Sequence, residues 1–240
     1  MTLVQSAARR TCTENTLRIQ HSMACDDLAN DKPYWSYEDI GIFFLVLVLI
    51  DLALRLLVRF HLLARSELSN PSVLLQFFLI ESLILDLYLV LKLRHHRPVL
   101  RSLGWVWPHM VYVIIGLVAG VLMATGIVLH LRYSHRSTPQ IGVMELLFLG
   151  VSLGPVLEES FFRGCLLPLL AQTTGNVVAV ILTAFLFALL HQPTDVVHWA
   201  SFMVTGVAYG WIRLASGSTI AAAVMHATYN FSLYSLATFC

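Results

Sequence analysis

The residues best suited to chemistry lie at 158–163, which read Glu-Glu-Ser-Phe-Phe-Arg. Glu159 and Arg163 are four residues apart, so on a helix they share a face and can form an ion pair. Glu158 points about 100° away from Glu159 and has no partner within this stretch. An unpaired carboxylate can serve as a general base. The alternative is a structural ion pair, which accounts for Glu159 and Arg163 but leaves the second glutamate unexplained.

Two histidines follow on later helical stretches. Phe187 and His191 are four residues apart, and so are His226 and Asn230, so each pair occupies one face of its helix. A lone histidine at a helix end is usually structural, and a His–Asn pair can simply join helices by hydrogen bonds. At 1.5 Å per residue, however, Glu158, His191 and the His–Asn pair lie about 12–22 Å from the turns next to them. They can therefore share one layer of a helix bundle.

Together these groups form a hydrolytic set. The carboxylate can deprotonate a water molecule and one histidine can orient it, while the other histidine and the asparagine amide stabilise an oxyanion. Alternatively, Glu158, His191 and His226 could hold Zn²⁺ with a water molecule in the fourth position. The residues and their spacing leave both chemistries open.

The amino-acid composition indicates that these polar side chains lie in a membrane protein. Of 240 residues, 58% are hydrophobic and only 12% are charged, about half the charged share of a soluble domain. These fractions exclude a disordered protein and an ordinary soluble enzyme and favour a polytopic membrane protein. The 15 Lys and Arg residues are scattered and the net charge is +1, which gives no reason to expect nucleic acid as a partner.

A charged side chain inside a membrane span is energetically costly, so each one needs a structural or functional reason. From residue 141 onward the charged residues are Glu145, Glu158, Glu159, Arg163, Asp195 and Arg213.

We expect an all-α bundle of about seven membrane-spanning helices, because a bilayer core about 30 Å thick takes roughly 20 helical residues to cross. The apolar runs are continuous, which favours helices over a barrel. A re-entrant or interfacial helix in the N-terminal tail would make eight. The expected spans are about 40–60, 72–92, 109–131, 141–170, 176–191, 196–214 and 218–238.

The chain divides into three expected parts: a polar tail at 1–39, two additional transmembrane helices at 40–99 and a core at 100–240. With seven spans, most Lys and Arg residues of the short loops fall on the N-terminal side, above all at 92–101. The positive-inside rule then places the N-terminus of this multi-pass protein in the cytoplasm.

The three patterns together resemble the family of CAAX prenyl endopeptidases and bacteriocin-processing proteins, also called the abortive-infection family. That family shows EExxxR, FxxxH and HxxxN on successive transmembrane helices. Here all three occur in order, at 158–163, 187–191 and 226–230. Each motif alone is weak, while the ordered set on apolar helices is specific. The resemblance covers roughly 100–240, and residues 1–99 match nothing specific.

The resemblance implies an intramembrane endopeptidase that cuts a peptide bond near the membrane surface. Eukaryotic type II members remove the last three residues of prenylated proteins. By resemblance, Glu158 and His191 would activate the water, while His226 and Asn230 would form the oxyanion site. The implied partners are membrane lipids and a peptide or prenylated protein C-terminus.

The resemblance gives Glu159 and Arg163 a supporting role beside the other site residues. Family members are often named metalloproteases, yet a metal-free, glutamate-dependent mechanism is also argued for some, and we favour the metal-free mechanism. Two other functions fit the residues. One is a non-catalytic immunity or scaffold protein whose polar cluster fastens helices, and the other is a small proton-linked transporter that uses intramembrane carboxylates.

Overall fold

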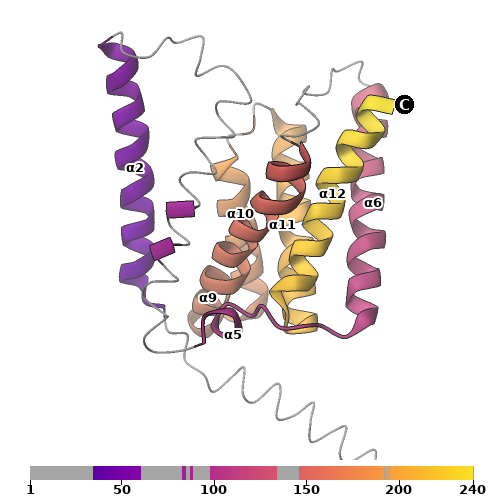
Figure 1. Ribbon diagram of the computed structural model, residues 1–240, viewed down its shortest axis with the longest axis horizontal. Helices are drawn as coiled ribbons and strands as arrows, with labels where there is room; N and C mark the ends of the chain where they lie inside the picture. The colour runs from indigo at the N-terminus through magenta and orange to yellow at the C-terminus, as the bar shows by residue number, and fades with distance from the viewer. Residues whose placement is uncertain are drawn as a thin grey trace, which may run out of the picture. The chain divides into compact units, whose positions relative to one another are not determined.

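The computed structural model describes residues 35–60, 83–84, 87–88, 98–133, 146–191, 193 and 195–239. Every described residue lies within the compact unit 34–240. Within these residues all regular structure is helical and no strand occurs (Figure 1), which confirms the predicted all-α class. Most of the predicted tail at 1–39 and most of the predicted span at 72–92 lie outside the described residues.

Two helices in the described part of the chain are long and apolar enough to cross a membrane, Tyr37–Arg59 and Met110–Leu131. The first is α2 (Tyr37–Arg59), and the second lies within α6 (Met110–Tyr133). A third apolar helix, α10 (Asn176–Leu190), is shorter. Helices thus occur at several of the predicted spans, while the count of seven membrane crossings stays a prediction.

The start of α2 is fixed by a capping box. Ser36 accepts a hydrogen bond from the backbone N–H of Asp39, and an Asp39 carboxylate oxygen accepts one from the Ser36 backbone N–H at 2.8 Å. The arrangement satisfies two of the N–H groups that a helix start leaves without partners. Asp39 also accepts from the Tyr88 hydroxyl at 2.9 Å.

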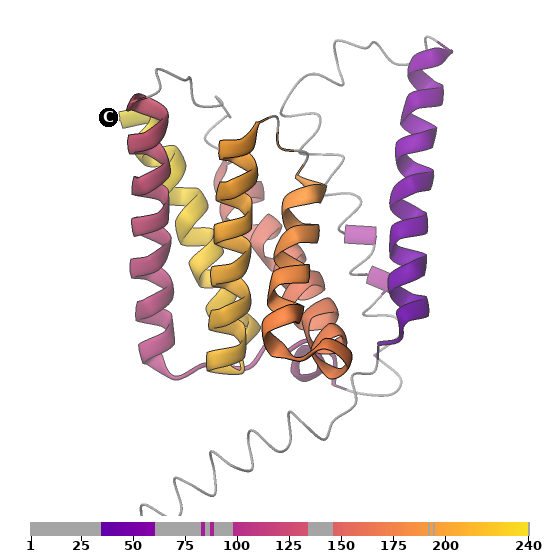
Figure 2. The same ribbon diagram turned by 180° about the vertical axis from the view of Figure 1, so that it is seen from behind.

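The C-terminal half of the chain is built around α12 (Thr219–Phe239), which packs along α6 and beside α11 (Val196–Ser216). Helix α10 packs against the other side of α11, so the four helices stand side by side (Figures 1 and 2). Glycines permit two of these close contacts. A Cβ on Gly120 would lie 2.8 Å from the Met225 carbonyl oxygen, and one on Gly206 would lie 3.0 Å from Ala184. Small residues of this kind let helix backbones approach closely.

Residues 146–174 form one run of helical backbone whose hydrogen-bond pattern changes along its length. It consists of the π-type segment η1 (Leu146–Leu153), α8 (Gly154–Glu159), the π-type segment η2 (Ser160–Leu166) and α9 (Leu167–Thr174). Pro155 and Pro168 lie in the first turns of α8 and α9. Because proline has no N–H, each one interrupts the ladder just after a π-type segment. The predicted single span at 141–170 is therefore an interrupted helix.

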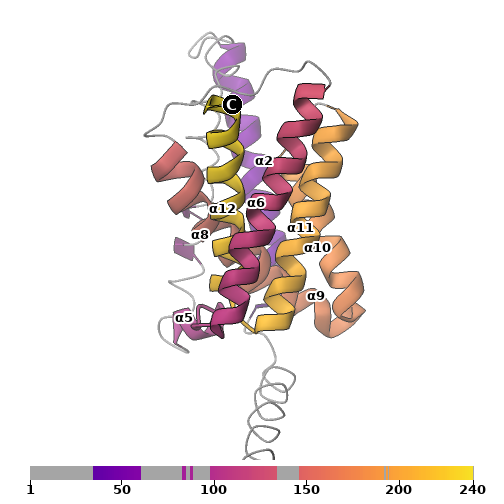
Figure 3. The ribbon, with the colours of Figure 1, turned by 90° about the vertical axis from the view of Figure 1, so that its right-hand side faces the viewer.

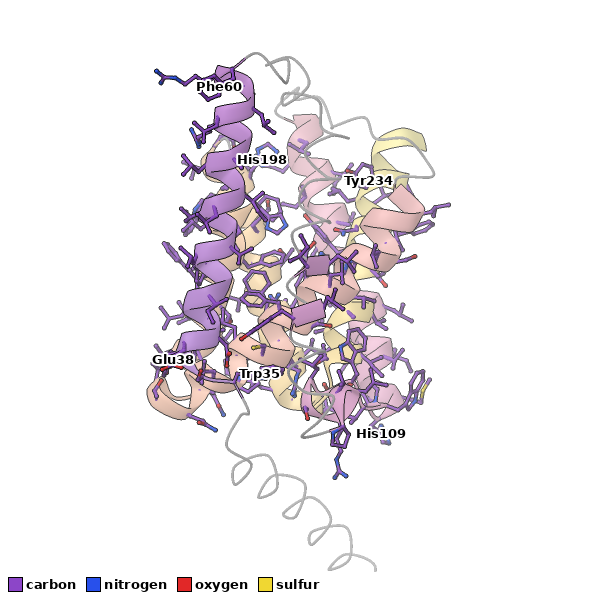
Figure 4. All side chains as sticks on the ribbon, turned by 60° about the vertical axis from the view of Figure 1, so that its left-hand side comes forward. Trp35, Glu38, Phe60, His109, His198 and Tyr234 are labelled. Atoms are coloured by element: carbon purple, nitrogen blue, oxygen red, sulfur yellow. The ribbon has the colours of Figure 1, made fainter. Side chains whose placement is uncertain are left out.

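The turn that follows α5 (Val99–Ser102) is tied to the start of α12. The Thr219 N–H donates to the Gly104 carbonyl at 2.8 Å, and the Thr219 hydroxyl donates to the Leu103 carbonyl at 2.6 Å. Gly104 has φ = 71°, which favours glycine. Figure 3 shows α5 at the end of the bundle where α6 and α12 begin. In Figure 4, His109 marks this end, while His198 and Tyr234 lie toward the other.

Candidate active site

The carboxylate of Glu159 joins three of the predicted site residues. Its Oε1 accepts a hydrogen bond from Arg163 Nη1 at 3.1 Å and lies 2.9 Å from His226 Nδ1. The side chains of Glu159 and Arg163 are 0% exposed. The spacing of four residues correctly predicted the Glu159–Arg163 pair, whereas the contact with His226 was not predicted. With its proton on Nδ1, His226 donates to Glu159 and directs Nε2 to the other side of its ring.

Glu158 lies beside this group and faces both histidines. Its Oε2 is 3.6 Å from His191 Nε2 and 4.0 Å from His226 Nε2, and its side chain is 9% exposed. These distances are too long for direct hydrogen bonds. Among the described residues, the guanidinium of Arg163 pairs with Glu159, whereas the groups that face Glu158 are the two imidazole rings. Glu158 is thus the carboxylate that remains available for proton transfer.

The end of α10 orients His191. Its Nδ1 lies 2.7 Å from the Phe187 carbonyl oxygen, which is one turn earlier. A carbonyl can only accept, so Nδ1 carries the proton, and in the neutral ring Nε2 is left as an acceptor that faces Glu158. The ring centroids of Phe187 and Phe202 both lie 4.4 Å from that of His191. The FxxxH spacing therefore supplies a backbone acceptor and an aromatic wall for the same histidine.

Arg163 links the polar group to α11 and to two aromatic rings. Its Nη2 donates to the Gly206 carbonyl at 2.9 Å. Its Cζ lies 4.9 Å from the ring centroid of Phe187 and 5.2 Å from that of Tyr209, within the range of a cation–π interaction. Hydrogen bonds and aromatic faces together compensate the burial of this charge.

Asn230, the sixth predicted site residue, lies one turn beyond His226 on α12. Its side-chain amide donates to the Gly150 carbonyl of η1 at 2.7 Å. The residue five positions after Gly150 is Pro155, which has no N–H to complete the π-type bond. Asn230 thus gives the Gly150 carbonyl a donor where the proline can supply none. Among the described contacts, its amide bonds to Gly150 rather than to Glu158 or a histidine.

Tyr209 belongs to this group although its sequence position did not single it out. Its ring stacks on His226 with centroids 4.7 Å apart and planes 18° apart. An uncharged aromatic residue on an apolar helix looks like ordinary core. The available signal was its place between Gly206 and Gly210, two residues that bring α11 close to α10.

Buried polar atoms without a hydrogen-bond partner are concentrated here. Of the described residues, five side-chain atoms are in this state, and four of them belong to the site just described. Such atoms are rare in folded proteins and often mark a functional site. The four are Glu158 Oε2, Glu159 Oε2, Arg163 Nε and the Tyr209 hydroxyl, and the fifth is Arg213 Nε.

Glu158, His191 and His226 are the residues that would bind a metal ion. The described part of the chain contains no group of three or more His, Cys, Asp and Glu side chains that could hold a metal ion. The contact of His226 Nδ1 with Glu159 leaves Nε2 on the side of Glu158, and a carboxylate on the other ring nitrogen is common for metal-binding histidines. Zinc bound by Glu158, His191 and His226 therefore stays an alternative from the sequence.

Part of the chain, including the site, resembles a known protein family. Residues 140–232 match a family model described as type II CAAX prenyl endopeptidase Rce1-like. The match contains all six predicted site residues, from Glu158 to Asn230. No curated protein and no solved structure matches the chain. The match supports the resemblance seen in the three motifs, points to a CAAX-type intramembrane protease and implies a peptide or protein substrate in a membrane context. Residues 140–232 are thus similar to the Rce1-like type II CAAX prenyl endopeptidases.

Proposed function

We propose that the protein is an intramembrane endopeptidase that hydrolyses a peptide bond near the membrane surface with a water molecule activated by Glu158. One observation carries the proposal. Glu158 Oε2 faces the Nε2 atoms of His191 and His226 at 3.6 and 4.0 Å, while the neighbouring Glu159 is engaged by Arg163 and His226. Of the two glutamates, Glu158 is the one whose carboxylate is available to act as a base.

Glu158 and His191 would hold the nucleophile together. Glu158 Oε2 is an acceptor, and so is His191 Nε2 when Nδ1–H donates to the Phe187 carbonyl. A water molecule can donate one O–H to each, which directs its oxygen lone pairs toward a substrate carbonyl. Glu158 takes the proton as the water attacks, and the protonated acid then delivers it to the leaving nitrogen.

The oxyanion would be stabilised from α12. A protonated His226 donates through Nε2, and the adjacent Glu159 carboxylate compensates the positive charge at Nδ1. The Asn230 amide has two N–H groups, and the bond to Gly150 uses one of them. We assign the second to the oxyanion. Arg163 holds the Glu159 carboxylate in place through their ion pair, which makes both supporting residues.

The substrate class follows from the family and from the apolar surroundings of the site. We propose a peptide or protein C-terminus, prenylated or otherwise membrane-bound, that reaches the site from the lipid. The catalytic core would span 100–240 within a multi-pass protein whose N-terminus lies in the cytoplasm. Membrane lipids are then the second partner.

The test is cleavage of prenylated and unprenylated peptides by the purified protein. We expect Glu158→Gln, which keeps the shape of the side chain, to lower kcat by roughly 10³-fold or more, because the amide cannot accept the proton of the water. Glu38→Gln is the matched control, since Glu38 is exposed in the first turn of α2, and it should cleave as the wild type does.

Two results would contradict the proposal: full activity in Glu158→Gln, or no cleavage of any peptide by the wild-type protein. A parallel series with a chelator tests the metal-free form of the mechanism, which predicts an unchanged rate. If the Glu158 and His226 variants only lowered thermal stability, the scaffold function would replace the peptidase. Proton flux into liposomes would favour the transporter.

A further inference from the structure

The side chain of Tyr209 is buried in a way that packing alone does not explain. The residue is 1% exposed, and its hydroxyl has no hydrogen-bond partner among the described residues. A phenylalanine would fill the same space without burying an unsatisfied hydroxyl, which costs free energy in the folded protein. The hydroxyl is therefore expected to gain its partner from a molecule that binds at the site.

The ring of Tyr209 is held by the two side chains that bind Glu159. It stacks on His226, with centroids 4.7 Å apart, and the Arg163 guanidinium lies 5.2 Å from its centroid. Phe187 packs edge-on against it at 6.1 Å. Contacts on several sides restrict the ring, so its hydroxyl has a fixed position relative to the imidazole of His226.

The surroundings of the hydroxyl are those of the reacting groups. The Tyr209 ring contacts His226 and Arg163, the two side chains that bind Glu159, and Glu158 Oε2 lies 4.0 Å from His226 Nε2. A phenol is neutral near pH 7 and can donate through its O–H. In a site that excludes water, a neutral donor held in place favours negative charge that develops during a reaction.

We propose that Tyr209 is a further catalytic residue, whose hydroxyl donates a hydrogen bond to the carbonyl oxygen of the scissile peptide bond as that oxygen becomes an oxyanion. The proton stays on the phenol oxygen throughout, and no covalent bond to Tyr209 forms. The oxyanion then has a donor from α11 in addition to those from α12. This inference rests on the proposed peptidase function and adds a residue outside the three sequence motifs.

The test compares Tyr209→Phe with the wild type on a peptide that the wild type cleaves. Loss of one oxyanion donor should lower kcat by roughly 10- to 100-fold, with KM within about twofold, because the ground-state carbonyl gains little from the bond. The melting temperature should stay equal or rise, since the variant removes an unsatisfied hydroxyl. Tyr112→Phe on α6, which is half-buried, is the matched control and should keep wild-type kcat.

A wild-type kcat in Tyr209→Phe would overturn the proposal and leave the peptidase function intact. Binding gives a second measurement that needs no turnover. A peptide aldehyde, whose hydrate resembles the tetrahedral intermediate, should bind Tyr209→Phe about tenfold more weakly, whereas the corresponding peptide alcohol should bind both proteins equally. Equal loss for both peptides, or no loss for either, would refute the role of the hydroxyl. If the wild type neither cleaves the peptides nor prefers the aldehyde, both proposals fail.

Discussion

Two buried arginines occupy very different regions of the molecule. Arg163, in the polar group beneath α11, is fully buried and binds Glu159, the Gly206 carbonyl and the faces of two aromatic rings. Arg213, at the end of the bundle beside Gly104, is 6% exposed, and its Nε has no partner. The first charge is embedded in groups that compensate it, while the second lies next to Gly104 with its Nε unpartnered among the described residues. A buried charged side chain therefore indicates a functional site only when the groups that bind it are considered as well.

The largest expected effect separates the two arginines directly. Arg163→Met should lower the free energy of unfolding by about 3–5 kcal/mol, because it leaves the buried Glu159 carboxylate without its cation. Arg213→Met should change it by less than about 1 kcal/mol or increase it, since no carboxylate of the described residues forms an ion pair with Arg213. Unfolding of both variants in mixed micelles measures the difference. Equal losses would show that the two arginines are held in the same way.

The next prediction concerns the packing of Arg213 at the bundle end. A Cβ on Gly104 would lie 2.5 Å from Arg213 Nη2 and 2.9 Å from the Thr219 hydroxyl, at a residue with φ = 71°. Gly104→Ala should therefore cost about 2–3 kcal/mol from strain and overpacking together. Gly126→Ala is the control, because nothing lies within 4 Å of its Cβ, and it should be neutral or stabilising. If the double variant Gly104→Ala/Arg213→Met were no more stable than Gly104→Ala alone, a clash with the Arg213 guanidinium would not be the cause of the loss.

The smallest effect belongs to the polar region and tests its attachment to η1. Asn230→Ala should cost about 1–2 kcal/mol, because the Gly150 carbonyl loses its donor. Pro155→Ala restores an N–H five residues after Gly150, so in the double variant the loss from Asn230→Ala should become smaller. A double-mutant cycle on the free energy of unfolding measures this coupling. Strictly additive effects would contradict the link between the proline and the asparagine.

Some contacts of the candidate site could be predicted from the sequence, and others could not. The Glu159–Arg163 pair follows from a spacing of four residues on one helix, and the depth estimate correctly placed Glu158, His191 and His226 in one layer. The contact between His226 and Glu159 joins residues 67 positions apart, so only the packing of α12 against 146–174 creates it. The spacing of a motif predicts which residues share a face of one helix. It does not predict which of two adjacent glutamates will contact a histidine on another helix.

Other features were not predicted because their signal is weak or lies outside the motifs. Tyr209 carries no charge and fits the apolar pattern of α11, so the sequence indicates an ordinary residue of the hydrophobic core. The π-type segments end shortly before Pro155 and Pro168, and the effect of a proline on the hydrogen-bond ladder depends on the turns around it. For Asn230 the sequence allowed either a role in the reaction or a hydrogen bond between helices, and it gave no indication that the Gly150 carbonyl would be the acceptor.

The bond between Asn230 and Gly150 has a mechanical consequence for α12. His226 and Asn230 are one turn apart, about 6 Å along the helix axis, and each is bonded to the 146–174 segment. Two attachments at different heights fix both the axial position of a helix and its rotation, whereas apolar side chains would tolerate sliding. A slip of α12 by one turn would break both bonds at once. The proline that frees the Gly150 carbonyl thus sets the height at which His226 is presented to the glutamates.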